Sequence, residues 1–377
     1  MKICILSLPL QLNCGGLLQA FALSNVLEQM GHDVEILTNK SIVVEPSLAE
    51  YCRLFFRKYV KRQNIDVFRI RRYLKQYPIV GEKLISFSER KLHSRKIIIF
   101  NEISPSDYDA FVVGSDQVWR KRYINNLWHS SIENAFLSFT KGWKVKRVAY
   151  APSFGTDVWE CNDIETDLLK KIIKSFDFVS VREQSGVDIC TKYLNSKAEH
   201  VLDPTMLLDS KQYVEILDVD CQAPSKGNLL TYILDYDNLK MKFVKRIETN
   251  TGYKSFSVNT NILDENLPLS DRIKPSVETW LRGFYDAELV ITDSFHACVF
   301  SILFKKDFFV VGNESRGLSR FTSLLSMFCL QDRLISSEII DTFDIVSVSK
   351  IDYDEVYKKL HNERKRCIKL LTDALQS

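Results

Sequence analysis

The stretch LVITDSFHACVFSILFKKDFFVV, residues 289–311, predicts a strand, a polar turn, a helix and a second strand in close succession. The apolar run 289–291 is typical of a buried strand, and 297–304 is typical of a buried helix. His296 stands where that strand gives way to the helix. Ligands of open α/β sheets bind beyond the strands' carboxyl ends, and helix N-termini attract anions. His296 is therefore either a proton-transfer group or a capping residue without chemistry.

The remainder of the chain repeats the alternation of strand and helix in two blocks. Strands are predicted at 2–8 and 34–38 in the first block, for example, and at 229–234 in the second. This alternation is typical of α/β domains with parallel sheets. We therefore expect two Rossmann-like domains with mainly parallel sheets and a site in the cleft between them. Their predicted limits are 1–200 and 201–350, and a terminal helix within 351–377 can pack back across both.

A basic segment at 47–96 interrupts the first block. From Arg53 to Lys96 there are 14 Lys or Arg and 3 Asp or Glu, although the whole chain carries a net charge of only +3. Aromatic residues are interleaved with these charges, among them Tyr51, Phe55, Phe56, Tyr59, Phe68 and Tyr73. We interpret the segment as a helical insertion on the first domain with its charge in solvent. Peripheral contact with an anionic membrane is the alternative, and no nucleic acid partner is expected.

The nine cysteines are scattered along the chain and form no CxxC pair. This usage fits a reducing cytoplasm rather than a disulfide framework or a zinc site. The N-terminus resembles a first strand more than a signal peptide, and no apolar run approaches membrane-spanning length. We expect a cytoplasmic protein without a metal or cofactor. The sequence does not indicate an oligomeric state.

Polar residues gather where several of the predicted strands end. They are Asn13, Gly15, Gly16 and Gln19 after the first strand, Gly114, Ser115 and Asp116 after a later one, Arg182 with Glu183, and Asp293 with Ser294. Asp116 is interpreted as a loop cap or a contact for a ligand. Asp293 either orients the site or caps the helix after it, and we favour the cap. The Arg182–Glu183 pair is either functional or a surface ion pair. Asp203, which precedes Pro204, is interpreted as part of a connector.

Six short motifs carry a family resemblance over most of the chain. They are NCGGLLQAFAL (13–23), FVVGSDQVW (111–119), AYAPSFG (149–155), SVREQSG (180–186), LDPT (202–205) and VITDSFH (290–296). In this order they resemble the polysaccharide pyruvyl transferase family. The resemblance implies two domains arranged as in GT-B glycosyltransferases, and transfer of a pyruvyl group from phosphoenolpyruvate to two sugar hydroxyls, forming a ketal. It implies a bacterial surface-polysaccharide (exopolysaccharide) precursor as acceptor, either free or lipid-linked at the inner membrane face.

The resemblance also assigns roles to single residues. His296 matches the family's catalytic histidine, and Arg182 matches an arginine that holds phosphoenolpyruvate. The chain departs from the family at Ser294, where well-characterised members have a second arginine; Arg316 and Arg320 are our candidates to replace it. Two other functions stay open. One is a glycosyltransferase that uses a nucleotide sugar, and the other is a non-catalytic assembly protein, which Ser294 favours.

Overall fold

The first half of the chain forms a seven-stranded parallel sheet in this computed structural model, which describes residues 1–10, 12–39, 45–262, 264, 266–312 and 317–376. The strand order is β3-β2-β1-β4-β5-β6-β7, which continues the Rossmann order 3-2-1-4-5-6 by one strand. The strands are β1 Lys2–Leu6, β2 Asp33–Asn39, β3 Ser94–Ile97, β4 Ala110–Val113, β5 Lys146–Ala149, β6 Phe178–Val181 and β7 Glu199–His200.

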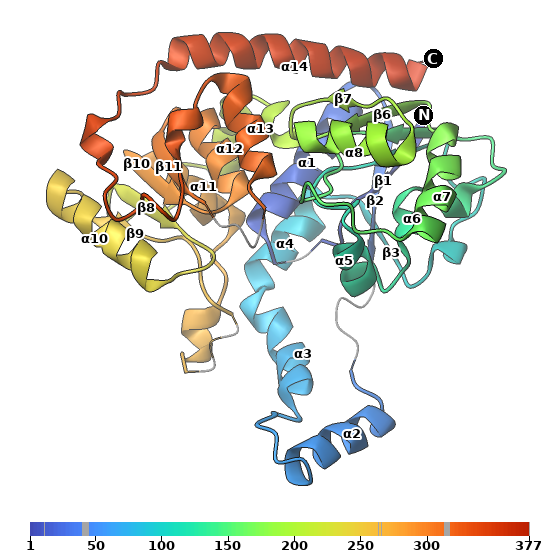
Figure 1. Cartoon of the computed structure of the whole chain (residues 1–377), viewed down its shortest axis with the longest axis horizontal. Helices are drawn as coiled ribbons and strands as arrows, with labels where there is room; N and C mark the ends of the chain where they lie inside the picture. Colours follow the sequence, from blue (N-terminus) through green and yellow to red (C-terminus); the bar gives the residue numbers. More distant parts are fainter. Residues whose placement is uncertain (11, 40–44, 263, 265, 313–316, 377) are drawn as a thin grey trace.

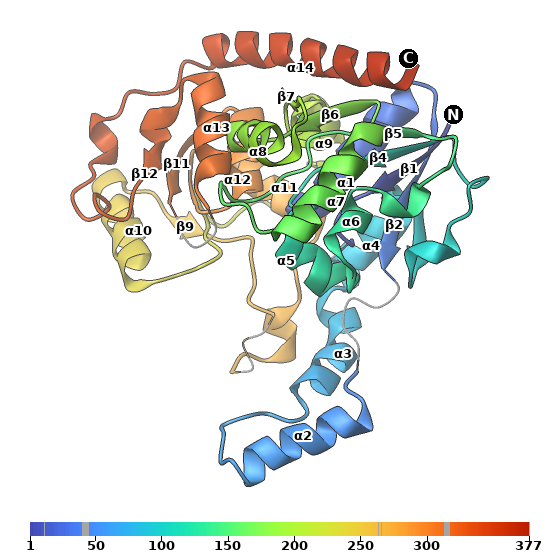
Figure 2. The same cartoon turned by 45° about the vertical axis from the view of Figure 1, so that its right-hand side comes forward.

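Helices cover both faces of this sheet (Figures 1 and 2). They are α1 Cys14–Gln29, α4 Glu82–Lys91, α5 Lys121–Tyr123, α6 Ile132–Ala135, α7 Asp163–Ile172 and α8 Gln184–Leu194. Helix α1 begins at Cys14, because the Asn13 side chain caps it by accepting a hydrogen bond from the Gly15 N–H at 3.1 Å. The two glycines of the motif therefore lie inside the first helical turn and not in a loop.

The second half forms a five-stranded parallel sheet in the order β9-β8-β10-β11-β12. Counted within this half, that is the flavodoxin-like order 2-1-3-4-5. The strands are β8 Leu229–Tyr232, β9 Ser255–Phe256, β10 Leu289–Thr292, β11 Asp307–Val311 and β12 Leu334–Ile335. The helices of this half are α9 Ser210–Leu217, α10 Asn238–Thr251, α11 Val277–Asp286, α12 Phe295–Leu303 and α13 Ser319–Phe328. The prediction of two Rossmann-like units with parallel sheets is confirmed.

The two halves share one apolar core. A single cluster of buried side chains includes Leu18 of α1 in the first half and Trp280 of α11 in the second. Helix α14, Tyr353–Gln376, crosses both halves on one side of the molecule (Figure 1). Near its start the Tyr357 ring packs against this core, and further along the backbone N–H of Leu202 donates to the Cys367 thiol at 3.4 Å. An interface of this apolar kind opposes independent motion of the halves.

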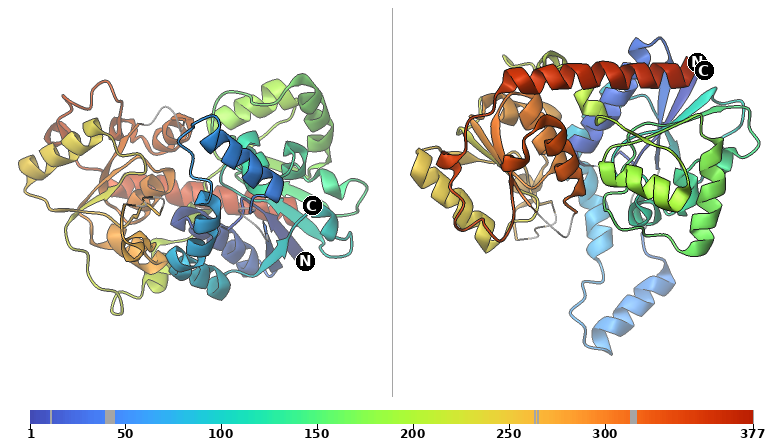
Figure 3. Two further views of the ribbon diagram at one scale, coloured as in Figure 1. Left: turned by 90° about the horizontal axis from the view of Figure 1, so that it is seen from below. Right: turned by 45° about the horizontal axis from the view of Figure 1, so that its top comes forward.

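The basic segment forms an arm that projects away from the two sheets (Figures 1, 2 and 3). Its helices are α2 Leu48–Tyr59 and α3 Arg69–Val80, and α4 lies at its base. Two interpretations of residues 47–96 need correction. First, residues 94–97 are β3, an edge strand of the main sheet and not insertion. Second, the base contacts both halves, because the N–H of Lys274 in the second half donates to the Val80 carbonyl at 2.7 Å.

Candidate functional site

A cavity of about 1020 Å³ lies where the carboxyl edges of the two sheets face each other. In the first sheet it is bordered by the loops after β1 and β4, and in the second by the loops after β8 and β10. These are the points at which the strand order of each sheet reverses, where α/β folds bind ligands. The first half contributes Ser7, Asn13, Gly16, Gln19 and Asp116 to the wall, and the second contributes Tyr232, Asn259, Lys274, Asp293, Ser294, His296 and Arg320.

His296 is on the first turn of α12 and lines the cavity, but it is only 7% exposed. It is therefore not the surface-facing residue that its position at a helix entry suggests. Burial lowers the pKa of its imidazole, although the carboxylates of Asp203 and Asp116 act in the opposite direction. Its Nε2 has no hydrogen-bond partner among the described residues. The imidazole therefore lines the cavity with a lowered pKa and with an Nε2 that is buried and unpaired among the described residues.

Helix α1 makes room for this imidazole. A Cβ atom built on Gly15 would lie 2.5 Å from both Cγ and Nδ1 of His296, which is closer than real Cβ contacts. The imidazole of His296, from the second half, therefore packs directly against the backbone of Gly15 in the first half. Gly16, one residue further on, has no such neighbour, because its nearest atom would be Asn13 Nδ2 at 3.7 Å.

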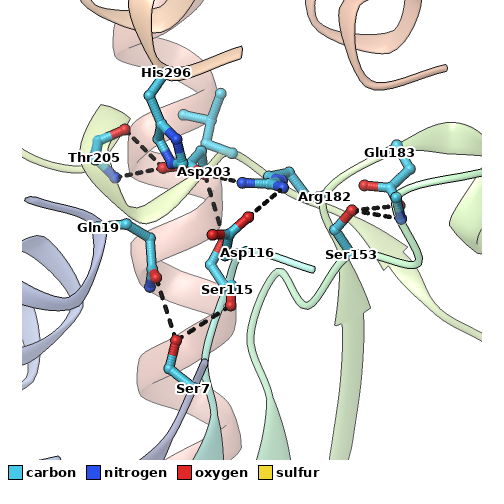
Figure 4. Close-up of polar contacts among 12 residues, drawn as sticks. Ser7, Gln19, Ser115, Asp116, Ser153, Arg182, Glu183, Asp203, Thr205 and His296 are labelled. Atoms are coloured by element: carbon cyan, nitrogen blue, oxygen red, sulfur yellow. Dashed lines mark hydrogen bonds and ion pairs between the residues drawn. The ribbon is translucent and has the colours of Figure 1, made fainter. Parts of the chain in front are cut away.

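Asp203 joins the polar groups around the cavity (Figure 4). Its Oδ1 accepts hydrogen bonds from the hydroxyl of Thr205 at 2.6 Å and from the N–H of Thr205 at 3.0 Å. Its Oδ2 lies 2.7 Å from Nη1 of Arg182 and 3.8 Å from Nε2 of His296. Burial alone would raise the pKa of Asp203, but the charge of Arg182 and the contact with His296 hold it below its usual value. Asp203 is thus an ionised carboxylate that can stabilise a protonated His296.

Arg182 is buried and lies between two carboxylates. Its side chain is 1% exposed, and Nη2 lies 3.4 Å from Oδ1 of Asp116. The alternative of a surface ion pair between Arg182 and Glu183 is wrong, because Glu183 is also buried and accepts from the Ser153 hydroxyl at 2.9 Å. Asp116 lines the cavity whereas Arg182 does not. An anion in the cavity would therefore reach the guanidinium of Arg182 by displacing Asp116.

Asp116 has a left-handed backbone with φ of 60°, a strained geometry that is concentrated at functional sites. Within the described part of the chain its carboxylate bonds to Arg182 and not to backbone N–H groups. The interpretation of Asp116 as a loop cap is therefore wrong.

Arg320 supplies a positive charge at the cavity wall. It lies on the first turn of α13, and its guanidinium carbon is 5.8 Å from the ring centre of Phe295. Burial and the nearby charge of Arg182 lower the pKa of Arg320 to about 10, so it stays charged at neutral pH. Arg182 is 4.4 Å from the same ring, and Phe295 thus holds both arginines. The other candidate, Arg316, lies outside the described residues.

Ser294 lines the cavity at the N-cap position of α12, and its side chain makes no capping bond. Asp293 beside it was interpreted as the cap of that helix, which is wrong. Its carboxylate accepts from the N–H groups of Leu234 and Asp235 at 2.6 and 3.1 Å, and from Lys240 Nζ at 2.8 Å. Asp293 therefore fixes the loop after β8, which forms part of the cavity wall.

The remaining candidates divide into cavity wall and support. Asn13, Gly16 and Gln19 are in the wall, and the side-chain Nε2 of Gln19 is buried without a hydrogen-bond partner among the described residues. Gly114 and Ser115 lie behind the wall. A Cβ on Gly114 would lie 3.1 Å from Ile5 Cγ2, and the Ser115 hydroxyl donates to Asp203 at 3.3 Å. These two residues thus support Asp203 and the first sheet.

Two residues at the site were missed from the sequence. Asp203 was interpreted as a connector, although an acidic residue that follows a short apolar run is the same signal that drew attention to Asp116. Lys274 lines the cavity, and its Nζ donates to Asn259 Oδ1 at 2.9 Å and to the Thr260 carbonyl at 2.8 Å. Nothing in its local sequence marks Lys274, because the loop between β9 and α11 has no periodic pattern. No group of three or more His, Cys, Asp or Glu in the described ranges could hold a metal ion.

Comparison with known proteins gives a family and a fold. The model of a family described as polysaccharide pyruvyl transferase matches residues 13–315. No protein of curated function matches the sequence. Among solved structures, UDP-GlcNAc 2-epimerase from Neisseria meningitidis, bound to UDP-GlcNAc, has a TM-score of 0.51 at 10% identity and covers 100% of both chains. Arabidopsis thaliana UGT89C1, complexed with UDP-L-rhamnose, has a TM-score of 0.50 at 9% identity and covers 99% of each chain. Both likenesses show the GT-B arrangement of two Rossmann-like domains.

Proposed function

Because the chain belongs to the polysaccharide pyruvyl transferase family, we propose that it transfers a pyruvyl group from phosphoenolpyruvate to two hydroxyls of a saccharide and forms a ketal. The observation that carries this proposal is the arrangement of His296. The His296 side chain lines a cavity between the domains, and Arg320 is in the same cavity wall. The Nε2 atom of His296 is buried without a hydrogen-bond partner among the described residues, 3.8 Å from the ionised carboxylate of Asp203. We further propose a bacterial surface-polysaccharide precursor as acceptor and the cytoplasm as the place of reaction.

The chemistry of ketal formation makes demands that these residues can meet. A proton is added to the methylene carbon of the enol, which leaves positive charge on the neighbouring carbon. One hydroxyl then attacks that carbon and loses its proton, phosphate leaves as its C–O bond breaks, and the second hydroxyl attacks and loses its proton. The products are the ketal and phosphate. His296 can accept and return these protons, and Asp203 stabilises its charged form.

The donor carries a carboxylate and a phosphate, and both need cationic partners. Arg320 is the guanidinium already in the cavity wall, and Lys274 is an amine in the same wall. Arg182 would join them once the donor replaces Asp116 at its Nη2. In this proposal Arg182 binds the donor and also holds Asp203 in place, so it serves the binding step and the proton transfer together.

A glycosyltransferase that uses a nucleotide sugar is the second candidate, because the two similar structures hold UDP-sugars within this architecture. A thermal shift experiment separates the candidates. Phosphoenolpyruvate at 100 times its Kd would stabilise the fold by about 2.7 kcal/mol, which raises the Tm of a chain of this size by about 3 °C. A rise with a UDP-sugar and none with phosphoenolpyruvate would refute the proposal. A rise with neither would favour a non-catalytic protein.

A further inference from the structure

The arm formed by residues 45–80 presents basic and apolar side chains together. The stretch contains nine Lys or Arg and three Asp or Glu, a net charge of +6. The three carboxylates are engaged within the arm: Glu50 in the capping box of α2 with Ser47, Glu45 with Arg71 at 3.6 Å, and Asp66 with Arg72. The basic residues therefore dominate the field that the arm presents to its surroundings.

The end of α2 combines these charges with exposed apolar surface. Residues 56–62 read FRKYVKR, and all seven are exposed. Phe56 is 51%, Tyr59 68% and Val60 64% exposed, and no residue of α2 is buried. Several large apolar side chains exposed together on one short helix are typical of a surface that binds a partner.

The arm is a folded unit and not a loose tail. The Phe68 ring packs against Phe55 with ring centres 5.7 Å apart and against Tyr51 at 5.9 Å, and Val67 beside it is 3% exposed. Helix α2 is thus fixed against the start of α3 by a small aromatic core. Tyr59 stacks on Phe55 with ring centres 6.0 Å apart, and Phe56, Tyr59 and Val60 remain exposed.

We propose that the arm docks on an anionic lipid surface through residues 56–62. The headgroups would attract the basic side chains, and the boundary between headgroups and acyl chains would take Phe56, Tyr59 and Val60. Aromatic side chains are favoured at that boundary. Nucleic acid offers charge but no apolar layer for Val60, and a protein partner would not require this excess of cations. No described helix is long and apolar enough to cross a bilayer, so the contact would be peripheral.

The position of the arm gives this docking a direction. The arm follows the carboxyl end of β2, and the loops that line the cavity follow the carboxyl ends of neighbouring strands in the same parallel sheet. Leu12, in the cavity wall, contacts the arm's base, since a Cβ on Gly81 would lie 2.3 Å from its side chain. Helix α14 lies on the opposite side of the molecule (Figures 1 and 2). An arm seated on lipid would turn the cavity edge, and not α14, towards the bilayer.

Co-sedimentation of the full chain with vesicles tests the proposal. Vesicles of phosphatidylcholine mixed equally with phosphatidylglycerol should bind the protein at low salt, and pure phosphatidylcholine should not. Because each basic residue near such a surface is worth about fivefold in binding, K58E/K61E/R62E should weaken it at least about 100-fold. The matched control K171E/K174E/K192E reverses three exposed charges far from the arm and should change binding little. F56S/Y59S keeps every charge and should weaken vesicle binding about tenfold or more, since it removes the two rings that would enter the lipid layer.

Hydrogen exchange locates the contact. Anionic vesicles should slow the exchange of amides in residues 48–62 and leave α14 unchanged. Equal binding by the arm variant and the control variant would overturn the proposal. Stronger binding to an RNA or DNA oligonucleotide than to the anionic vesicles would also overturn it. The same holds if the protein forms a dimer in the absence of lipid and F56S/Y59S dissociates that dimer. None of these outcomes depends on the reaction in the cavity, so the proposed function can fail while the docking surface stands.

Discussion

Replacing Gly15 with alanine should prevent His296 from acting in the reaction, although His296 itself is unchanged. The new Cβ would lie 2.5 Å from the imidazole and 2.7 Å from the Cβ of His296, which is attached to the backbone of α12 and cannot swing away. Ordinary contacts between carbon atoms are about 3.5–4.0 Å. The imidazole must therefore shift by about 1 Å, which would change the position of Nε2 relative to Asp203 and the cavity.

The size of the effect follows from this displacement. A misplacement of about 1 Å in a catalytic group can reduce the rate about 100-fold. Alanine also favours the helix over glycine by roughly 0.5–1 kcal/mol, which offsets part of the steric cost in α1. Gly15→Ala should therefore keep its secondary structure and lose most of its turnover. Gly16→Ala is the matched control, because its Cβ meets nothing closer than 3.7 Å and adds the same methyl group to the same helical turn without displacing His296. Gly16 lines the cavity itself, so the expected result is a turnover clearly higher than that of Gly15→Ala.

The assay is phosphate release from phosphoenolpyruvate in the presence of acceptor saccharide, with circular dichroism and Tm measured on the same samples. Turnover of Gly15→Ala equal to that of Gly16→Ala would refute the reasoning, since the position of His296 would then not matter to the reaction. Loss of secondary structure in Gly15→Ala alone would show that this contact is needed for folding instead.

Three further predictions concern residues of the site. His296→Gln should lower turnover about 10²- to 10⁴-fold. Burial depresses the pKa of His296 in the folded protein below 6.5, so its contribution to the unfolding free energy is present above that pH and is lost as the pH falls below it. In urea titrations at decreasing pH, the unfolding free energy of the variant should therefore fall less steeply than that of the native protein. Arg182→Ala leaves the carboxylate of Asp203 buried without its cation and should cost about 3–5 kcal/mol of unfolding free energy, much of which Arg182→Ala/Asp203→Asn should recover; equal stability of the two variants would contradict the pairing. Ser294→Arg should lower the KM for phosphoenolpyruvate about tenfold, the effect of one charge-assisted hydrogen bond, and an unchanged KM would place the donor away from Ser294.

The sequence predicted the two parallel α/β units because period and composition report local structure directly. It predicted His296 and Asp116 at the cavity for the same reason, since a polar residue just after a buried strand must lie at the sheet's carboxyl edge. Pairing in space is not encoded in that way. The bond between Arg182 and Asp203 depends on where β6 and the end of β7 come to lie side by side, and the sequence led to a connector at Asp203. Burial was missed in the same manner, because His296 becomes buried only when α1 packs over it.

The prediction that Asp293 caps α12 was wrong for a different reason. Asp293 has the residue type and position of an N-cap, yet its carboxylate bonds to the loop after β8 and to Lys240. The preference of such a residue for an N-cap competes with its contacts in the folded structure. Here the carboxylate pairs with the buried amine of Lys240 instead of capping the helix. The strand at 94–97 was missed because its sequence, SRKI, has two basic residues and only one apolar residue, Ile97.

The contact of His296 with Gly15 also has a consequence for how the molecule folds and fails. The two residues come from opposite halves of the chain, so their contact closes a long loop and should form late. Either half can form its own strands and helices while this contact is still open. In mild denaturant we therefore expect a population that retains its circular dichroism and has already lost its activity.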